Sequence, residues 1–136
     1  MPGIFYRSRD GLSNFETGPQ RFEPDMRHAA MLVRDQRLLV FWTRAGDTPE
    51  RIWPSTLDLR GDWREWPETE PVEILRPELP WEGSDLPLEP SVRSSVTGVV
   101  NQLRDPAIHC ESDSTHLLYV GGGKSAIGIA ELDIDA

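Results

Sequence analysis

Apolar residues in this chain recur mostly at every second position, in short runs that polar turns separate. A period of two is typical of β-strands, and the spacing typical of helices is nearly absent. The pattern predicts an all-β fold, with two strands near the N-terminus in "IFYRS" and "NFETG". Further strands are predicted at 27–33, 38–42, 51–58, 72–75, 106–109, 116–120 and 126–132.

The segment 76–95 breaks this pattern. It contains four prolines, several acidic residues and few residues that favour strands. A loop longer than about 15 residues in a compact domain is usually functional or disordered. We therefore expect a long connector here rather than a strand.

Two segments of the chain resemble each other. "LLVF" at 38–41 falls on "LLYV" at 117–120, and "STLDL" at 55–59 falls on "AELDI" at 130–134. Each copy reads as strand, polar turn, strand, glycine-containing loop and strand, which is typical of a β-propeller blade. The predicted fold is an incomplete propeller of four-stranded antiparallel meander blades, about two and a half in number. Its parts are the outer strands of a preceding blade (1–24), a full blade (25–76), the connector (77–100) and a last blade (101–136).

The amino-acid composition argues against some classes of binding partner. The chain has 14 Lys and Arg against 23 Asp and Glu, a formal net charge of −9, which argues against nucleic acid or an anionic membrane. A neutral ligand such as a sugar is unaffected by this balance. Neither a membrane-spanning run nor a signal-peptide core is present, so a cytoplasmic location is expected. The single cysteine, Cys110, is expected to be a small buried hydrophobic residue.

Polar residues gather where a propeller places its central site. In a meander blade the start of the inner strand, the loop between the second and third strands, and the connector meet at one face. The candidate residues there are Arg27, His28, Glu50, Arg51, Asn101, Arg104 and Asp105. The alternative is that these are solvated loop ends, or that an Arg–Asp pair only holds one blade to the next.

The stretch "LRDPAI" followed by "HLLYVGGGKSAIGIAEL" resembles the closing blade of five-bladed β-propeller glycosidases, close to glycoside hydrolase family 43 and its relatives. "RHAAMLVRDQRLLVFWTRAGDTPERIWPSTLDLRGDW" is similar to a penultimate blade in uncharacterised members of that group. The resemblance implies hydrolysis of a carbohydrate by paired carboxylates. It makes Asp105, which matches the Asp of the family's Asp-Pro turn, and Glu50, as the acid, the catalytic candidates. The substrate-binding candidates are Arg27, His28, Arg51, Asn101 and Arg104.

The resemblance also implies that blades are missing. A five-bladed propeller needs about twenty strands and the pattern predicts nine. Open sheet edges and bare apolar faces favour association, so a homo-oligomer is expected. Two other functions stay open: a noncatalytic carbohydrate-binding module that uses Arg27, Arg104 and either Trp42 or Trp81, or a scaffold fragment without a ligand.

Neither a cofactor nor a metal is predicted. The "GGGKS" stretch at 121–125 precedes a predicted strand, whereas a phosphate-binding loop needs a helix there. The three histidines, His28, His109 and His116, lack a spacing typical of metal ligands.

Overall fold

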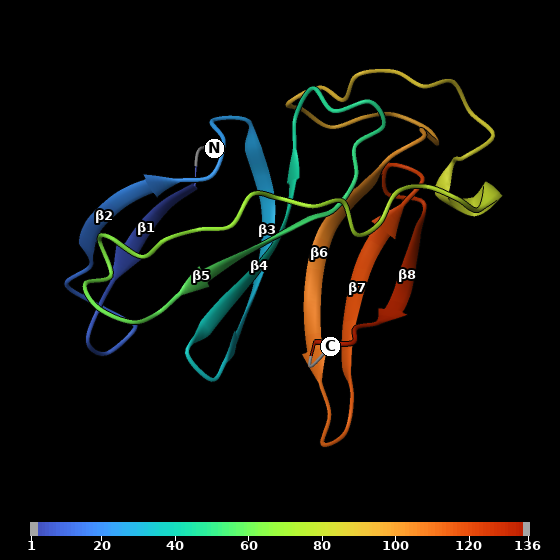
Figure 1. Cartoon of the computed structure of the whole chain (residues 1–136). Coiled ribbons are helices and arrows are strands. Elements are labelled where there is room, and N and C mark those ends of the chain that lie inside the picture. Colours follow the sequence, from blue (N-terminus) through green and yellow to red (C-terminus); the bar gives the residue numbers. More distant parts are fainter. Residues whose placement is uncertain (1–2, 135–136) are drawn as a thin grey trace.

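The computed structural model describes residues 3–134 and consists of three small antiparallel sheets that lie side by side (Figure 1). Within these residues, the one helical element is the 3₁₀ turn η1 (Pro80–Glu82), and no helix is long and apolar enough to cross a membrane. The all-β prediction is therefore confirmed. The sheets are β1 (Gly3–Arg7) and β2 (Glu16–Arg21); β3 (Met26–Arg34), β4 (Arg37–Arg44) and β5 (Trp53–Asp58); β6 (Leu103–Cys110), β7 (Thr115–Gly121) and β8 (Ala126–Glu131).

The strand predicted at 72–75 is wrong. This segment runs beside β5 and forms only isolated bridges, such as the one between Ile52 and Leu75. Pro67 and Pro71 lie in the same stretch and lack the N–H that a regular ladder requires. The middle sheet consequently has three strands, in the order β3-β4-β5, rather than four, and the last sheet also has three, in the order β6-β7-β8.

Side chains of β4 supply the core on both faces of the middle sheet, because successive residues of a strand point to opposite sides. Val40 and Trp42 pack with Met26 and Leu57, next to the β1–β2 sheet. Phe41 points the other way. It packs against residues that come mainly from the β6–β8 sheet: Ile52, Leu103, Leu117 and Tyr119. The middle sheet is thus covered on both faces.

A bulge begins the first strand of each three-stranded sheet. The pairing register shifts between Met26 and Ala29 on β3, and between Arg104 and Ala107 on β6. In the second bulge Asp105 adopts a left-handed backbone conformation with φ of 47°, which Asp tolerates better than most residues. A bulge re-aims the side chains beside it. Because β3 and β6 are neighbours (Figure 1), both bulges present polar side chains to the same place.

The connector is ordered and docks on the last sheet through η1. The Trp81 ring stacks on Tyr119 with ring centroids 6.1 Å apart. Gly128 leaves the space for this pair, since a Cβ there would lie 2.4 Å from the Tyr119 ring and 2.6 Å from the Trp81 ring. The buried Glu82 carboxylate accepts a hydrogen bond of 2.7 Å from the Tyr119 hydroxyl, and burial is the main cause that raises the pKa of Tyr119. Trp81 is therefore a docking residue.

One sequence expectation on β6 is revised. Cys110 is exposed, because it is the last residue of β6, which is an edge strand. His109 also lies directly opposite His116 in the β6–β7 register, and the two rings stack with centroids 6.5 Å apart. Among residues 3–134, however, no three His, Cys, Asp or Glu side chains are grouped closely enough to hold a metal ion.

Candidate functional site

Glu50 lies at the joint between the two similar sheets. It lies shortly before β5, and its carbonyl accepts a hydrogen bond of 2.9 Å from the Leu103 N–H at the start of β6. A parallel bridge pairs Glu50 with Gln102. These backbone contacts fix the Glu50 side chain between β3 and β6, where it has no exposed surface.

Two arginines surround the Glu50 carboxylate, one from each sheet. The Oε2 atom lies 3.3 Å from Arg104 Nε and 3.4 Å from Arg27 Nη1. The Oε1 atom makes no hydrogen bond, and His28 Nδ1 lies 3.9 Å away. Burial raises the pKa of Glu50 above its ordinary value of 4.5, and the nearby Thr43 hydroxyl and the two guanidinium groups only partly oppose this effect. Glu50 therefore keeps its proton up to a higher pH than an exposed glutamate does.

His28 connects Glu50 to the second carboxylate, Asp105. Its Nε2 lies 3.0 Å from Asp105 Oδ1, and its Nδ1 lies 3.2 Å from Thr43 Oγ1. A carboxylate accepts, so we assign the ring proton to Nε2 and the donated bond on Nδ1 to the Thr43 hydroxyl. Burial is the main cause that lowers the pKa of His28 below 6.5, the charges of Arg27 and other cations adding to it. The neutral ring that results fits one donor and one acceptor.

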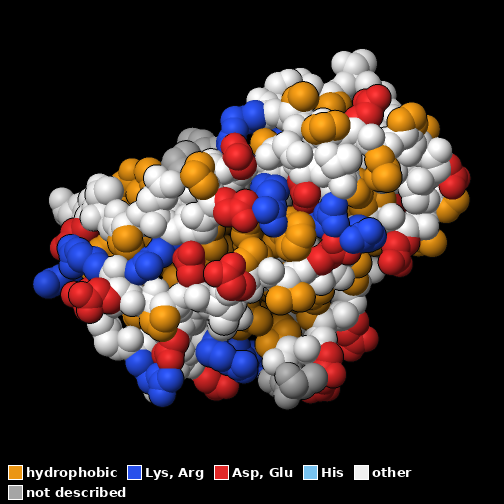
Figure 2. Space-filling model, turned by 45° about the horizontal axis from the view of Figure 1, so that its top comes forward, with side chains coloured by type: hydrophobic (Ala, Val, Ile, Leu, Met, Phe, Trp, Pro, Cys, Tyr) orange, Lys and Arg blue, Asp and Glu red, His pale blue; other side chains and the backbone are white. Residues whose placement is uncertain are grey.

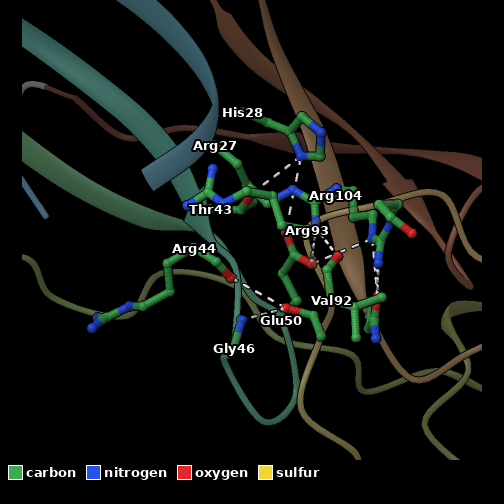
Figure 3. A network of polar contacts seen from close by, with 12 residues as sticks. Arg27, His28, Thr43, Arg44, Gly46, Glu50, Val92, Arg93 and Arg104 are labelled. Atoms are coloured by element: carbon green, nitrogen blue, oxygen red, sulfur yellow. Dashed lines mark hydrogen bonds and ion pairs between the residues drawn. The ribbon is translucent and has the colours of Figure 1, made fainter. Parts of the chain in front are cut away.

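The connector completes the support of both arginines (Figure 3). Arg104 is buried and donates from Nε to Gln102 Oε1 at 2.9 Å and from Nη1 to the Ser94 carbonyl at 3.4 Å. Arg27 donates from Nη1 to the Val92 carbonyl at 2.7 Å. Figure 3 shows the side chains converging from β3, β4, β6 and the connector. The β3–β4 hairpin, the connector and β6 thus build one network.

The two carboxylates lie close together but differ in exposure. Because one imidazole ring approaches both, the nearest Glu50 and Asp105 oxygens are at most about 9 Å apart. The side chain of Asp105 is 38% exposed and that of His28 is 25% exposed. A ligand can therefore reach Asp105 and His28 directly, whereas Glu50 lies behind them.

Five of the seven residues predicted from the sequence come together in this network: Arg27, His28, Glu50, Arg104 and Asp105. The other two lie outside it. Arg51 pairs with Asp47 and Glu73, and Asn101 donates to the Leu86 carbonyl at 3.0 Å. Of the two tryptophans considered as ligand platforms, Trp42 is buried and donates to Ser55 Oγ, and Trp81 packs on β7 and β8.

Sequence reasoning missed Thr43 and assigned no role to Gln102. Thr43 is fully buried beside His28, and its signal is a hydroxyl residue within the apolar run "LLVFWTR" of β4. Gln102 is buried and accepts from Arg104. A glutamine two residues before a buried arginine gives no comparable signal, because either side chain could equally face solvent.

Charged side chains of both signs are spread over the surface of the molecule (Figure 2). Figure 2 shows acidic and basic side chains interleaved across one face, with apolar side chains between them. The larger hollows lie elsewhere. One of about 630 Å³, for example, is lined by residues of the β1–β2 hairpin together with Trp63. We place the candidate site at the Glu50–His28–Asp105 network because the interacting groups are there.

No family model matches this chain, and no solved structure matches it. The chain is 34% identical, over 146 aligned residues, to an uncharacterized protein of Acanthamoeba polyphaga mimivirus. The alignment takes in 96% of this chain but 41% of the viral protein. The chain therefore spans less than half the length of this relative.

Proposed function

We propose that this chain is part of a glycosidase-like β-propeller and that it binds a carbohydrate at the Glu50–Asp105 network. The repeated three-stranded meander, with a bulge near the start of the first strand of each copy, supports the propeller.

One observation carries the functional part of the proposal. Carboxylates from the two sheets approach a single imidazole ring, and one of them has a raised pKa. Glycoside hydrolysis needs such a pair, in which one side chain holds a proton and the other is a carboxylate. A separation of at most about 9 Å is compatible with either stereochemical outcome.

The exposed groups define how a sugar would be held. Asp105 would accept hydrogen bonds from sugar hydroxyls, and His28 would orient it. In a hydrolytic reaction, Asp105 would take a proton from the attacking water while the leaving oxygen gains one. The leaving oxygen would take its proton from solvent, because Glu50 has no exposed surface and His28 Nε2 already donates to Asp105.

A second candidate is binding without hydrolysis, and the full burial of Glu50 favours it. Glu50 contacts Arg27 and Arg104 rather than open space, and so it could serve only to hold the two sheets together. In that case Asp105 and His28 would bind the sugar and no step would follow.

Titration with sugars tests both candidates. We expect methyl glycosides to shift amide resonances of residues 26–28 and 103–107, and Asp105→Asn to weaken binding at least tenfold. Asp113→Asn, in the exposed β6–β7 turn, is the matched control and should bind normally. If the wild type releases nitrophenolate from nitrophenyl glycosides and Asp105→Asn does not, hydrolysis is established. Unchanged spectra with every sugar at millimolar concentrations would contradict the proposal.

A further inference from the structure

The outer face of the β6–β8 sheet is apolar and uncovered. On this face Leu118 of β7 is paired with Ile129 of β8, and Val120 of β7 is paired with Ile127 of β8. Ile127 is 75% exposed and Ile129 is 63% exposed. We call these four residues the tail face. An isoleucine pair this exposed on a regular sheet is typical of a surface that another element covers.

The internal repeat shows what kind of surface covers such a face. By the alignment of the copies, Leu118 and Val120 correspond to Leu39 and Phe41 on the middle sheet. Phe41 is 2% exposed, because the inner face of the β6–β8 sheet packs on it. The tail face is therefore the second copy of a surface that, within this chain, is covered by the next sheet.

The opposite end of the molecule offers an uncovered sheet surface. In β1, Phe5 points inward to the core, so that Ile4 and Tyr6 point outward. Their exposed fractions are 39% and 57%. We call Ile4 and Tyr6 the head face. The β1–β2 sheet covers the middle sheet with one side, and its head face is free to receive a further sheet.

The charges of the two ends are complementary. Residues 3–21 contain three arginines against two acidic residues, whereas residues 110–134 contain four acidic residues against one lysine. In a chain with a net charge of −9, contacts between two tail ends would be repulsive, and a tail-to-head contact is the favourable one.

We propose that the tail face of one molecule binds the head face of a second copy of this chain. The contact is heterologous, since it joins two different surfaces, and it continues the sheet stacking seen inside the molecule. The tail face and the head face are thus the surfaces through which the homo-oligomer expected from the sequence would form. This association does not depend on carbohydrate binding, so a result that contradicts one of the two proposals does not affect the other.

Complementary variants test this arrangement. Ile129→Lys blocks the tail face and Tyr6→Lys blocks the head face, and both positions are exposed, so that folding is preserved. We expect the wild type to sediment as two or more chains per particle and each variant alone as a monomer. An equimolar mixture should recover dimers, because each variant keeps the surface that the other has lost. Leu88→Lys, at a position 64% exposed in the connector, is the matched control and should associate as the wild type does.

Three outcomes would overturn the proposal. A monomeric wild type at several hundred micromolar would mean that no second copy occupies the tail face. Dimers of Tyr6→Lys alone would indicate a symmetric contact between two tail faces. A mixture that remains monomeric would show that the head and tail faces do not bind each other. Circular dichroism of each variant confirms that its sheet content is that of the wild type.

Discussion

At the residue scale, Glu50 is a buried acidic side chain beside two guanidinium groups. The Arg104 side chain is also fully buried. Removal of one partner from such a group leaves an uncompensated buried charge, which typically costs about 3–5 kcal/mol. We therefore expect Glu50→Ala to lower the free energy of unfolding by this amount, as measured by urea denaturation at pH 7. A loss below about 1 kcal/mol would mean that Arg104 finds sufficient other partners.

Glu50→Gln is the control, because it keeps the size and shape of the side chain but cannot ionise. Burial raises the pKa of Glu50 in the folded state above the value of 4.5. The carboxyl group therefore contributes stability that is fully present below pH 4.5 and is lost as the pH rises through the folded-state pKa. Relative to Glu50→Gln, the wild type should lose stability between pH 4.5 and pH 7. A wild type that gains stability over this range would contradict the raised pKa.

The sequence predicted most of this network because the repeat aligns the starts of the two inner strands. Arg27 and His28 begin one copy, and Arg104 and Asp105 begin the other. It could not separate Glu50 from Arg51. Neighbouring residues in extended backbone point to opposite sides, and the sequence alone does not show which side faces the other sheet. The structure turns Glu50 inward and Arg51 towards Glu73.

At the element scale, the connector depends on a glycine in β8. The absence of a side chain at Gly128 leaves the space in which the Trp81 and Tyr119 rings meet. Gly128→Ala should undock η1 and lower the free energy of unfolding by about 1–3 kcal/mol, the usual cost of overpacking. Denaturation followed by tryptophan fluorescence measures both effects. Leu88→Ala, in the connector but 64% exposed, is the control and should change little.

Alternation alone predicted the paired strands but not their irregularities. The register shifts on β3 and β6 arise from pairing between strands, and a single strand's pattern of apolar residues does not encode its partner's register. The segment 72–75 has the alternation of a strand, yet neighbouring prolines remove ladder donors. The docking of η1 likewise depends on contacts with β7 and β8, which are distant in the sequence.

At the scale of the whole molecule, the three sheets are expected to differ in stability. The β1–β2 sheet has two strands, and Trp63 from the segment after β5 packs over its Gly18. Trp63 is 6% exposed, and truncation of a buried tryptophan typically costs about 3–5 kcal/mol. In Trp63→Ala, hydrogen exchange should accelerate at residues 3–21 and stay unchanged at 103–131. Equal acceleration in all three sheets would show a single cooperative unit instead.

The position of Glu50 at the joint between two sheets has a consequence for the history of this protein. The Glu50 carbonyl and carboxylate hold the middle sheet to the β6–β8 sheet, and the carboxylate also forms the buried side of the candidate site. Selection for folding alone would therefore preserve Glu50, Arg104 and Arg27, even in a descendant that had ceased to bind anything. Their persistence among relatives is then weak evidence of activity. Asp105 is partly exposed and joins the network through His28. In a descendant that no longer binds a ligand, we therefore expect Asp105 to be substituted first.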